Sequence, residues 1–223
     1  IFHLLIAKQY ELDLPVCILN IGGISNVTFI TEPINKLSLI SKDTGPGNCL
    51  IDKWLRKNSK KKFDEDGQLA ARGNINEIIL EQAQELFSHR KNRKNLSFDT
   101  EDFDISFARG LSLEDGAATL TKFTSKIISS SLLQICSTKT SSPIKVIVCG
   151  GGRKNLTMID QIKKDISKKF TIKNIDDYKI NGDFIESQAF AFLAIRSFQG
   201  LPISFPGTTG CKKACIGGEL IKN

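Results

Sequence analysis

Residues 16–30 read VCILNIGGISNVTFI, and this stretch decides the predicted fold. Two runs of β-prone residues, 16–20 and 27–30, lie on either side of a glycine pair, and a third run covers 37–40. Branched and aromatic residues separated by Gly, Asn or Pro are typical of short strands joined by turns. The pattern therefore predicts an antiparallel meander of three strands.

Apolar residues recur at helical spacing downstream of the meander. Two predicted helices, to about residue 56 and over 75–87, each align one apolar side: Leu50, Trp54 and Leu55, then Ile78, Ile79, Ala83 and Leu86. Ser112, with Asp115 three residues on, is the predicted N-cap of a helix that runs to about Cys136. Residues 184–198 form a strongly apolar helix, and we expect its face to pack against the core.

A second strand pattern lies in the last third of the chain. Residues 146–149 (VIVC) meet three glycines and then a helical pattern over 156–168, and residues 170–172 suggest a further strand. A strand, a glycine turn and a helix form the unit expected beside a nucleotide. We therefore predict the α/β class, with one domain over 15–223. Residues 1–14, which start at Ile and resemble the middle of a helix, are predicted to be the tail of a helix from a preceding, amino-terminal domain.

The composition restricts the class of function. The chain has 223 residues, 40% hydrophobic and 25% charged, and no apolar run near the roughly 18 residues of a membrane helix, so we expect a globular cytoplasmic protein without a membrane partner. Its net charge of +7 comes from Lys and Arg spread along the chain with few aromatic residues between them, which favours a solvated surface over a nucleic-acid groove. Six cysteines without a CxxC pair favour reduced thiols over zinc or disulfides.

Two glycine motifs lie in or beside the predicted meander. In NIGGISN (20–26), Gly22 and Gly23 would let backbone amides approach an oxyanion, although an ordinary hairpin turn gives the same pattern. In DTGPGN (43–48), the following helix would turn its N-terminal amides towards an anion, and Asp43 would serve a magnesium ion through water. Taken alone, the string is better explained by a turn before a capped helix. Its candidate ATP-binding residues are Asp43, Gly45, Gly47 and Asn48.

A third glycine motif follows the strand at 146–149. Gly150, Gly151 and Gly152, with Asn155 opening the next helix, would let an adenosine lie across the turn. The string does not fit the spaced-glycine dinucleotide fingerprint, and alone it is a weak indication.

These motifs, in this order, resemble the anhydro-N-acetylmuramic acid kinase family, and specifically its carboxy-terminal part. The matching segments are NIGGISN (20–26), DTGPGN with Asp52, FDEDGQLAARG (63–73), DGAATLT (115–121), VCGGGRKN (148–155), ESQAFAFLA (186–194) and TTG (208–210). The resemblance covers the chain from about residue 15 to its last residue.

The resemblance implies a ribonuclease-H-like domain of the actin-like ATPase type, with a mixed sheet flanked by helices. It implies that Gly22, Gly23 and Asn26 line a phosphate loop, and that the turn at 150–152 with Asn155 contacts adenosine. Glu186 resembles the family's glutamate near the sugar, although a carboxylate at a helix start is also favoured by the helix dipole. ATP and Mg²⁺ are the implied cofactors, with no direct protein cage for the metal.

The implied reaction transfers the γ-phosphate of ATP to the 6-oxygen of 1,6-anhydro-N-acetylmuramic acid, while water opens the anhydro ring. The general-base aspartate is expected upstream of residue 1, so the chain would need an amino-terminal half as a partner. A homodimer is a further expectation from the family.

One segment departs from the family pattern. At 96–104 (LSFDTEDFD) the family reads roughly KSTGREYFN, so Leu96 and Thr100 stand where a Lys and an Arg are expected. Each charge-assisted hydrogen bond lost near an anion would cost about 1.5–3 kcal/mol. An inactive fragment or a non-catalytic nucleotide-binding module is therefore the alternative to a kinase domain.

Overall fold

The computed structural model describes residues 1–31, 39–91, 97–137, 143–219 and 221. Within these residues, five strands form one mixed sheet in the order β3-β2-β1-β4-β5. The strands are β1 (Val16–Ile21), β2 (Ile24–Ile30), β3 (Ile40–Pro46), β4 (Ile144–Cys149) and β5 (Phe170–Asn174). β1 pairs antiparallel with β2 and parallel with β4, β2 pairs antiparallel with β3, and β4 pairs parallel with β5.

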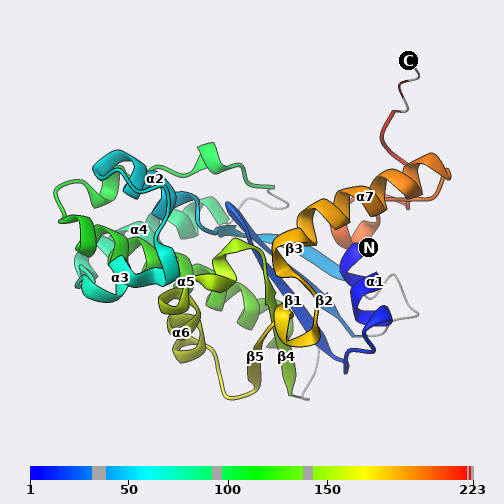
Figure 1. Cartoon of the computed structure of the whole chain (residues 1–223), viewed down its shortest axis with the longest axis horizontal. Coiled ribbons are helices and arrows are strands. Elements are labelled where there is room, and N and C mark those ends of the chain that lie inside the picture. The colour runs from blue at the N-terminus through cyan, green and yellow to red at the C-terminus, as the bar shows by residue number, and fades with distance from the viewer. Residues whose placement is uncertain (32–38, 92–96, 138–142, 220, 222–223) are drawn as a thin grey trace.

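Helices cover both faces of the sheet (Figure 1). Their bounds are α1 Phe2–Gln9, α2 Cys49–Asn58, α3 Gln68–Arg72, α4 Glu77–Lys91, α5 Leu113–Ser137, α6 Leu156–Asp165, α7 Ile185–Phe198 and α8 Pro206–Thr209. Side chains of β1 alternate between the faces, as expected for a strand buried on both sides. Cys17 and Leu19 join the core beneath α2 to α6, whereas Val16 and Ile18 join the core beneath α1.

The α/β class, the mixed sheet flanked by helices and the antiparallel meander are confirmed. The N-cap of α5 is confirmed too, since Ser112 Oγ accepts a hydrogen bond from the Asp115 amide at 3.0 Å. α1 buries Leu4, Ile6 and Ala7 against this domain's own sheet, and the domain boundary near residue 15 stays a prediction.

The predicted third strand was misplaced. The strand spans Ile40–Pro46, and residues 37 and 38 lie outside the described residues. Asp43 therefore lies inside β3, paired with Asn26, and not in a loop after a strand. The segment SKDTGP (41–46) was not recognised as a strand, because it contains polar residues and two turn-forming residues. It becomes a strand by pairing with β2.

One predicted helix face and one predicted helix end were also wrong. α4 buries Leu80, Ala83 and Phe87, while Ile78 and Leu86 are 71% and 67% exposed. α6 ends at Asp165 and does not reach residue 168.

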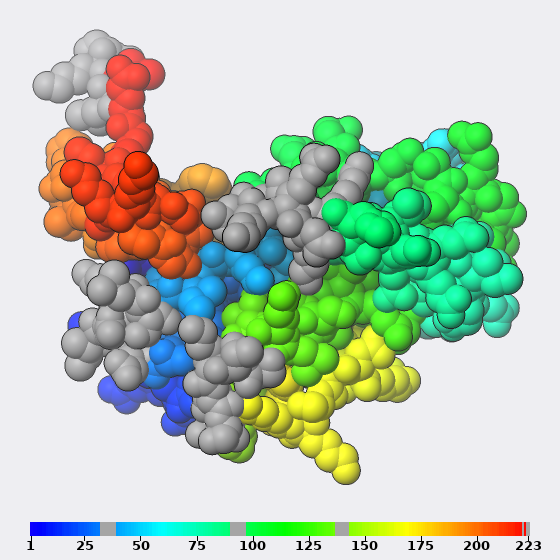
Figure 2. Space-filling model, turned by 180° about the vertical axis from the view of Figure 1, so that it is seen from behind, coloured from blue at the N-terminus to red at the C-terminus, as the bar shows by residue number. Residues whose placement is uncertain are grey.

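The expectation that the face of α7 packs against the core was wrong as well. Within α7, Ile185 is buried, whereas Phe190 is 66% exposed and Phe198 is 74% exposed. The helix runs away from the sheet, and with the last part of the chain it forms a lobe at one end of the molecule (Figures 1 and 2). Periodicity predicted the helix, but nothing in its apolar sequence indicated how little of it the described core would cover.

Candidate functional site

The glycine pair and the start of α2 are joined by backbone hydrogen bonds. The amides of Gly47 and Cys49 donate to the Gly23 carbonyl at 2.9 and 3.2 Å, and the Asn48 amide donates to the Gly22 carbonyl at 2.8 Å. A Cβ on Gly47 would collide with the Gly22 carbonyl, so the close approach requires glycine there. These three amides are therefore engaged by the turn, and anion binding at the start of α2 stays a prediction.

The side chain of Asn48 instead lines a cavity of about 440 Å³, here called the glycine-turn cavity. Three of its residues were predicted as ATP-binding: Asn48, Gly151 and Asn155. The other lining residues come from α2, from the segment before α3 and from the glycine turn: Ile51, Asp52, Phe63, Asp64, Glu65, Asp66 and Lys154. The structure thus brings together one residue of the DTGPGN motif and two of the VCGGGRKN motif.

The three glycines of the turn have different roles. Gly150 has φ +78°, and a Cβ there would lie 2.7 Å from the Ile21 carbonyl oxygen, while a Cβ on Gly152 would collide with the Ile21 side chain. A Cβ on Gly151 would meet only Asn48 Nδ2, at 3.7 Å. Gly150 and Gly152 are therefore required for packing against β1, and Gly151 is the glycine with open space at the cavity.

Asn155 closes the turn and begins α6. It is 6% exposed, and its Oδ1 accepts a hydrogen bond from the Met158 amide at 2.9 Å as an N-cap. Two residues on, in the first turn of α6, Thr157 Oγ1 donates to the Gly67 carbonyl at 2.8 Å, which joins α6 to the segment before α3. Asn155 thus shapes one wall of the cavity through its capping bond.

Two carboxylates of the glycine-turn cavity received no role in the sequence analysis. Burial raises the pKa of Asp52 to about 6, opposed by Arg56, whose nearest nitrogen lies 3.5 Å from the carboxylate. Asp64 is buried, and its two oxygens accept the Leu69 and Ala70 amides at 2.8 and 3.0 Å, so it caps α3. Both lie in motifs that the sequence analysis quoted, but their burial was not visible from spacing.

Three of the remaining candidate residues, Asn26, Asp43 and Glu186, line a second group of cavities, here called the hairpin cavities. One, of about 630 Å³, contains Asp43, and another, of about 340 Å³, contains Glu186. Both are lined by Asn26, Ser41, Thr208 and Thr209, so the TTG motif reaches this site. Asn20, near the end of β1, lines the second of these cavities, and a Cβ on Gly150 would touch the Asn20 side-chain oxygen. The end of β1 therefore lies between the glycine-turn cavity and the hairpin cavities.

The departing segment lies directly on these motifs. Asp43 Oδ2 accepts hydrogen bonds from the Phe98 amide at 2.9 Å and from Ser97 Oγ at 3.2 Å. Thr100 faces Gly23, where an added Cβ would lie 3.1 Å from the Thr100 methyl group. Leu96 lies outside the described residues.

A cation that sequence reasoning missed enters this segment from α2. Lys53 Nζ donates to the Thr100 carbonyl at 2.7 Å and lies 3.1 Å from a Glu101 carboxylate oxygen. Its position at the fifth residue of α2 gave no indication of this contact, because the partner segment is nearly 50 residues away in sequence. Lys53 therefore supplies a positive charge next to Thr100, where the family pattern has its own cation.

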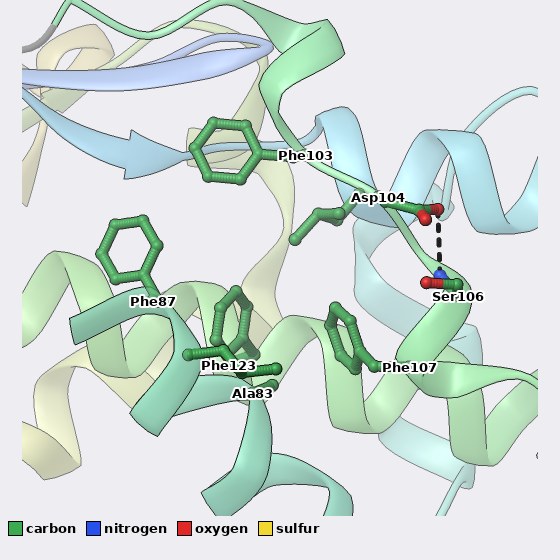
Figure 3. A pocket seen from close by; sticks show the side chains of 9 residues that line it. Ala83, Phe87, Phe103, Asp104, Ser106, Phe107 and Phe123 are labelled. Atoms are coloured by element: carbon green, nitrogen blue, oxygen red, sulfur yellow. Dashed lines mark hydrogen bonds between the residues drawn. The ribbon is translucent and has the colours of Figure 1, made fainter. Parts of the chain in front are cut away.

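An aromatic cavity of about 290 Å³ lies on the far side of β3 and contains no predicted site residue (Figure 3). Phe87, Phe103, Phe107 and Phe123 surround it, with Phe87 and Phe123 in an edge-to-face contact. Gly45 has φ +146°, and a Cβ there would lie 3.0 Å from Phe87 Cζ. Packing against this aromatic group thus accounts for the glycine at position 45, which was predicted as ATP-binding.

Fold and cavities define an α/β domain with a mixed sheet, with a glycine turn at one cavity and two carboxylates at a neighbouring pair. The profile of the family described as "Anhydro-N-acetylmuramic acid kinase" matches residues 1–223, and the chain belongs to that family. The match confirms the family that the sequence motifs indicated, but it does not confirm the carboxy-terminal placement.

Curated relatives agree with the family. The chain is 50% identical over 223 residues to an anhydro-N-acetylmuramic acid kinase of Pelagibacter ubique (strain HTCC1062), covering 100% of the chain and 59% of the relative. It is 39% identical over 212 residues to the kinase of that name from Zymomonas mobilis, covering 94% of the chain and 55% of the relative. The chain thus spans little more than half the length of these relatives.

Among solved structures, the chain is similar to an activator of 2-hydroxyisocaproyl-CoA dehydratase from Clostridium difficile with bound ADPNP. The TM-score is 0.47 at 15% identity, with 86% of this chain and 66% of that chain covered.

Within the described ranges, no helix has the length and apolar character needed to cross a membrane. Over the same residues, no cluster of three or more His, Cys, Asp or Glu side chains is arranged to hold a metal ion.

Proposed function

We propose that this chain provides the nucleotide-binding part of an ATP-dependent kinase that converts 1,6-anhydro-N-acetylmuramic acid to N-acetylmuramic acid 6-phosphate in peptidoglycan recycling. The observation that carries the proposal is the glycine-turn cavity, in which Asn48, Gly151 and Asn155 meet from two separate motifs. Its volume of about 440 Å³ is within the range of small-molecule sites. Membership of the kinase family supports the reaction class.

In this proposal the adenosine of ATP lies in the glycine-turn cavity against Gly151, and the phosphates extend past the end of β1 towards Gly22, Gly23 and Asn26. The sugar occupies the hairpin cavities. Magnesium accompanies the phosphates and is held mainly through water, which suits an ion that keeps several of its waters.

Phosphoryl transfer of this kind needs positioning, charge neutralisation and a group that accepts a proton. The hairpin cavities offer the carboxylates of Asp43 and Glu186, which lie beside shared walls. The hydrogen bonds from Ser97 and Phe98 hold the Asp43 carboxylate in place. In this proposal Asp43 faces the magnesium through water and Glu186 orients the sugar, while the general-base aspartate comes from the part of the kinase outside this chain.

A titration calorimeter tests the nucleotide site on this chain. We expect MgATP to bind the chain, Gly151→Val to abolish binding, and Ala194→Val, which adds methyl groups on exposed α7, to leave it intact. Equal binding by the chain and Gly151→Val would place the nucleotide elsewhere, and an absence of binding to the chain at millimolar MgATP would contradict a nucleotide site within it.

The alternative, a non-catalytic nucleotide-binding module, is favoured by Thr100 and Leu96 at the two positions of expected cations. A chimera separates the two functions: this chain replaces the matching 223 residues of the Pelagibacter ubique relative, to which it is 50% identical. Phosphorylation of 1,6-anhydro-N-acetylmuramic acid by the chimera supports the kinase, and a folded chimera that binds MgATP without turnover supports the module.

A further inference from the structure

Arg153 is a buried cation that the nucleotide site, as described so far, does not use. Its side chain is 3% exposed, yet it lies in the glycine motif directly after Gly152. A guanidinium in such a place requires hydrogen-bonding partners of opposite charge, since an isolated buried charge is strongly unfavourable. The partners of Arg153 come from three separate segments.

On one side, Arg153 holds the glycine turn. Its Nη1 donates to the Gly150 carbonyl at 3.0 Å, the residue whose positive φ begins the turn. On the other side, Nε donates to Asp176 at 2.7 Å and Nη1 donates to Asp183 at 2.8 Å. The planar fork of arginine suits this simultaneous binding of fixed acceptors, which a lysine ammonium cannot reproduce.

Asp183 lies in the short turn Gly182–Phe184 that leads directly into α7. Glu186 is in the first turn of that helix. Asp176 strengthens the same junction, since it accepts the Gly182 amide at 2.9 Å, and a Cβ on Gly182 would collide with the Arg153 side chain. The start of α7 is thus fastened to Arg153 by two carboxylates and a close backbone approach.

Most apolar side chains of α7 are exposed, and beyond its first turn the helix contacts α1 through the rings of Phe192 and Phe2. The first turn is therefore one of the places where α7 is held against the domain. The pKa of Asp183 is lowered to about 2 by the hydrogen bonds from Arg153 and Lys154, so this carboxylate is charged at neutral pH and its bond to Arg153 is charge-assisted.

We propose that Arg153 is a positioning residue that couples the glycine turn to Glu186, so that occupation of the glycine-turn cavity fixes the start of α7. The inference rests on the proposed function, because it takes the turn as the nucleotide site and Glu186 as a residue of the sugar site. Arg153 acts through Gly150 on one side and through Asp183 on the other, and it touches neither ligand.

Amide hydrogen exchange on this chain tests the coupling, with and without MgATP. Asp183→Asn weakens the hydrogen bond between Arg153 and the turn before α7 and leaves the other hydrogen bonds of Arg153. Arg153→Lys keeps the positive charge but loses the planar guanidinium that binds several acceptors at once. Lys164→Met is the matched control, because it removes an exposed ion pair with Asp160 elsewhere on α6. The readout is the exchange rate at the turn, 150–153, and at the start of α7, 183–187.

Without nucleotide, we expect Asp183→Asn to accelerate exchange about tenfold at 183–187 and measurably at 150–153, since a charge-assisted bond is lost. Lys164→Met leaves both segments unchanged. With MgATP, we expect exchange to slow at both segments in the unmodified chain and only at 150–153 in Asp183→Asn. In Arg153→Lys, the slowing at both segments is smaller than in the unmodified chain. A purely structural role would accelerate exchange without changing how 183–187 responds to nucleotide.

The inference is overturned if MgATP protects the turn of the unmodified chain but not 183–187, or if Asp183→Asn retains that protection. If MgATP protects neither segment, the proposed nucleotide site is wrong. The nucleotide-free comparison then decides whether the link exists: acceleration at 150–153 by Asp183→Asn supports it, and unchanged exchange there overturns it.

Discussion

Asp52 provides a quantitative test of the glycine-turn cavity. Its carboxylate lies in the first turn of α2 and lines the cavity, and burial raises its pKa to about 6 from an ordinary value of 3.8. The folded state therefore retains the proton over a pH range in which the unfolded chain has already lost it. Above pH 6 the folded state must hold a partly buried charge, so we expect Asp52 to lower stability there and Asp52→Asn to raise it.

The size of the effect follows from the pKa difference. A shift of about two units corresponds to about 3 kcal/mol at 1.36 kcal/mol per unit. The Asp52 side chain is 24% exposed and Arg56 is nearby, so screening by solvent and by that cation reduces the expected effect to on the order of 1 kcal/mol. The gain from Asp52→Asn is thus about 1 kcal/mol at pH 8, decreases as the pH falls from 6 to 4, and vanishes below the unfolded pKa.

Urea unfolding at pH 8, 6 and 4 measures this difference. The single tryptophan, Trp54, is buried on the same helix and donates through Nε1 to the Leu113 carbonyl at 2.9 Å, so its fluorescence reports the unfolding of α2 and α5. Asp160→Asn, at an exposed carboxylate on α6, is the matched control and should change stability little at any pH. A stabilisation by Asp52→Asn that is equal at pH 4 and pH 8, or a loss of stability at pH 8, would refute the assignment of burial as the cause.

Four further outcomes are expected. Gly152→Ala lowers the melting temperature well below that of Gly151→Ala, because the added methyl group collides with β1 in the first variant and meets open space in the second. Phe87→Ala lowers the free energy of unfolding by about 3–5 kcal/mol in urea, since a buried ring that contacts three other Phe rings is removed. Asp183→Asn is less stable than the unmodified chain at pH 7, and acid titration of both shows this difference disappearing as the pH falls from 4 to 2, because the depressed pKa of Asp183 stabilises the fold only above that range. In the active chimera, Glu186→Gln lowers kcat at least tenfold and leaves the KM for MgATP unchanged. A loss of rate that persists at saturating sugar assigns Glu186 to the chemical step rather than to sugar binding.

Sequence patterns predicted best where local chemistry decides the structure. The β1–β2 hairpin and the N-cap of α5 were predicted correctly, because a glycine pair between β-prone runs and a serine before a helical pattern act on their immediate neighbours. β3 was misplaced because its polar sequence becomes a strand only by pairing with β2. Exposed apolar residues of α4 and α7 were assigned to the core, because both sides of these helices carry apolar residues. Tertiary packing decides which side is buried.

The candidate site shows the same division. The glycines were recognised as special, but the reasons differ: Gly45, Gly47, Gly150 and Gly152 satisfy close packing, whereas Gly151 has open space. Contacts across long sequence separations were beyond local patterns. Lys53 at Thr100 and Arg153 at Asp183 depend on segments that meet only after folding.

The hydrogen bonds from the start of α2 to the glycine pair have a mechanical consequence. Gly22 holds Asn48, and the neighbouring Ile21 packs against Gly150 and Gly152, so the last residues of β1 fasten the hairpin, α2 and the glycine turn into one rigid block. A displacement of any of these three parts would break packing in the other two. Motion during a reaction cycle is therefore directed to parts outside this block, such as the lobe that follows the first turn of α7, whose apolar side chains are mostly exposed.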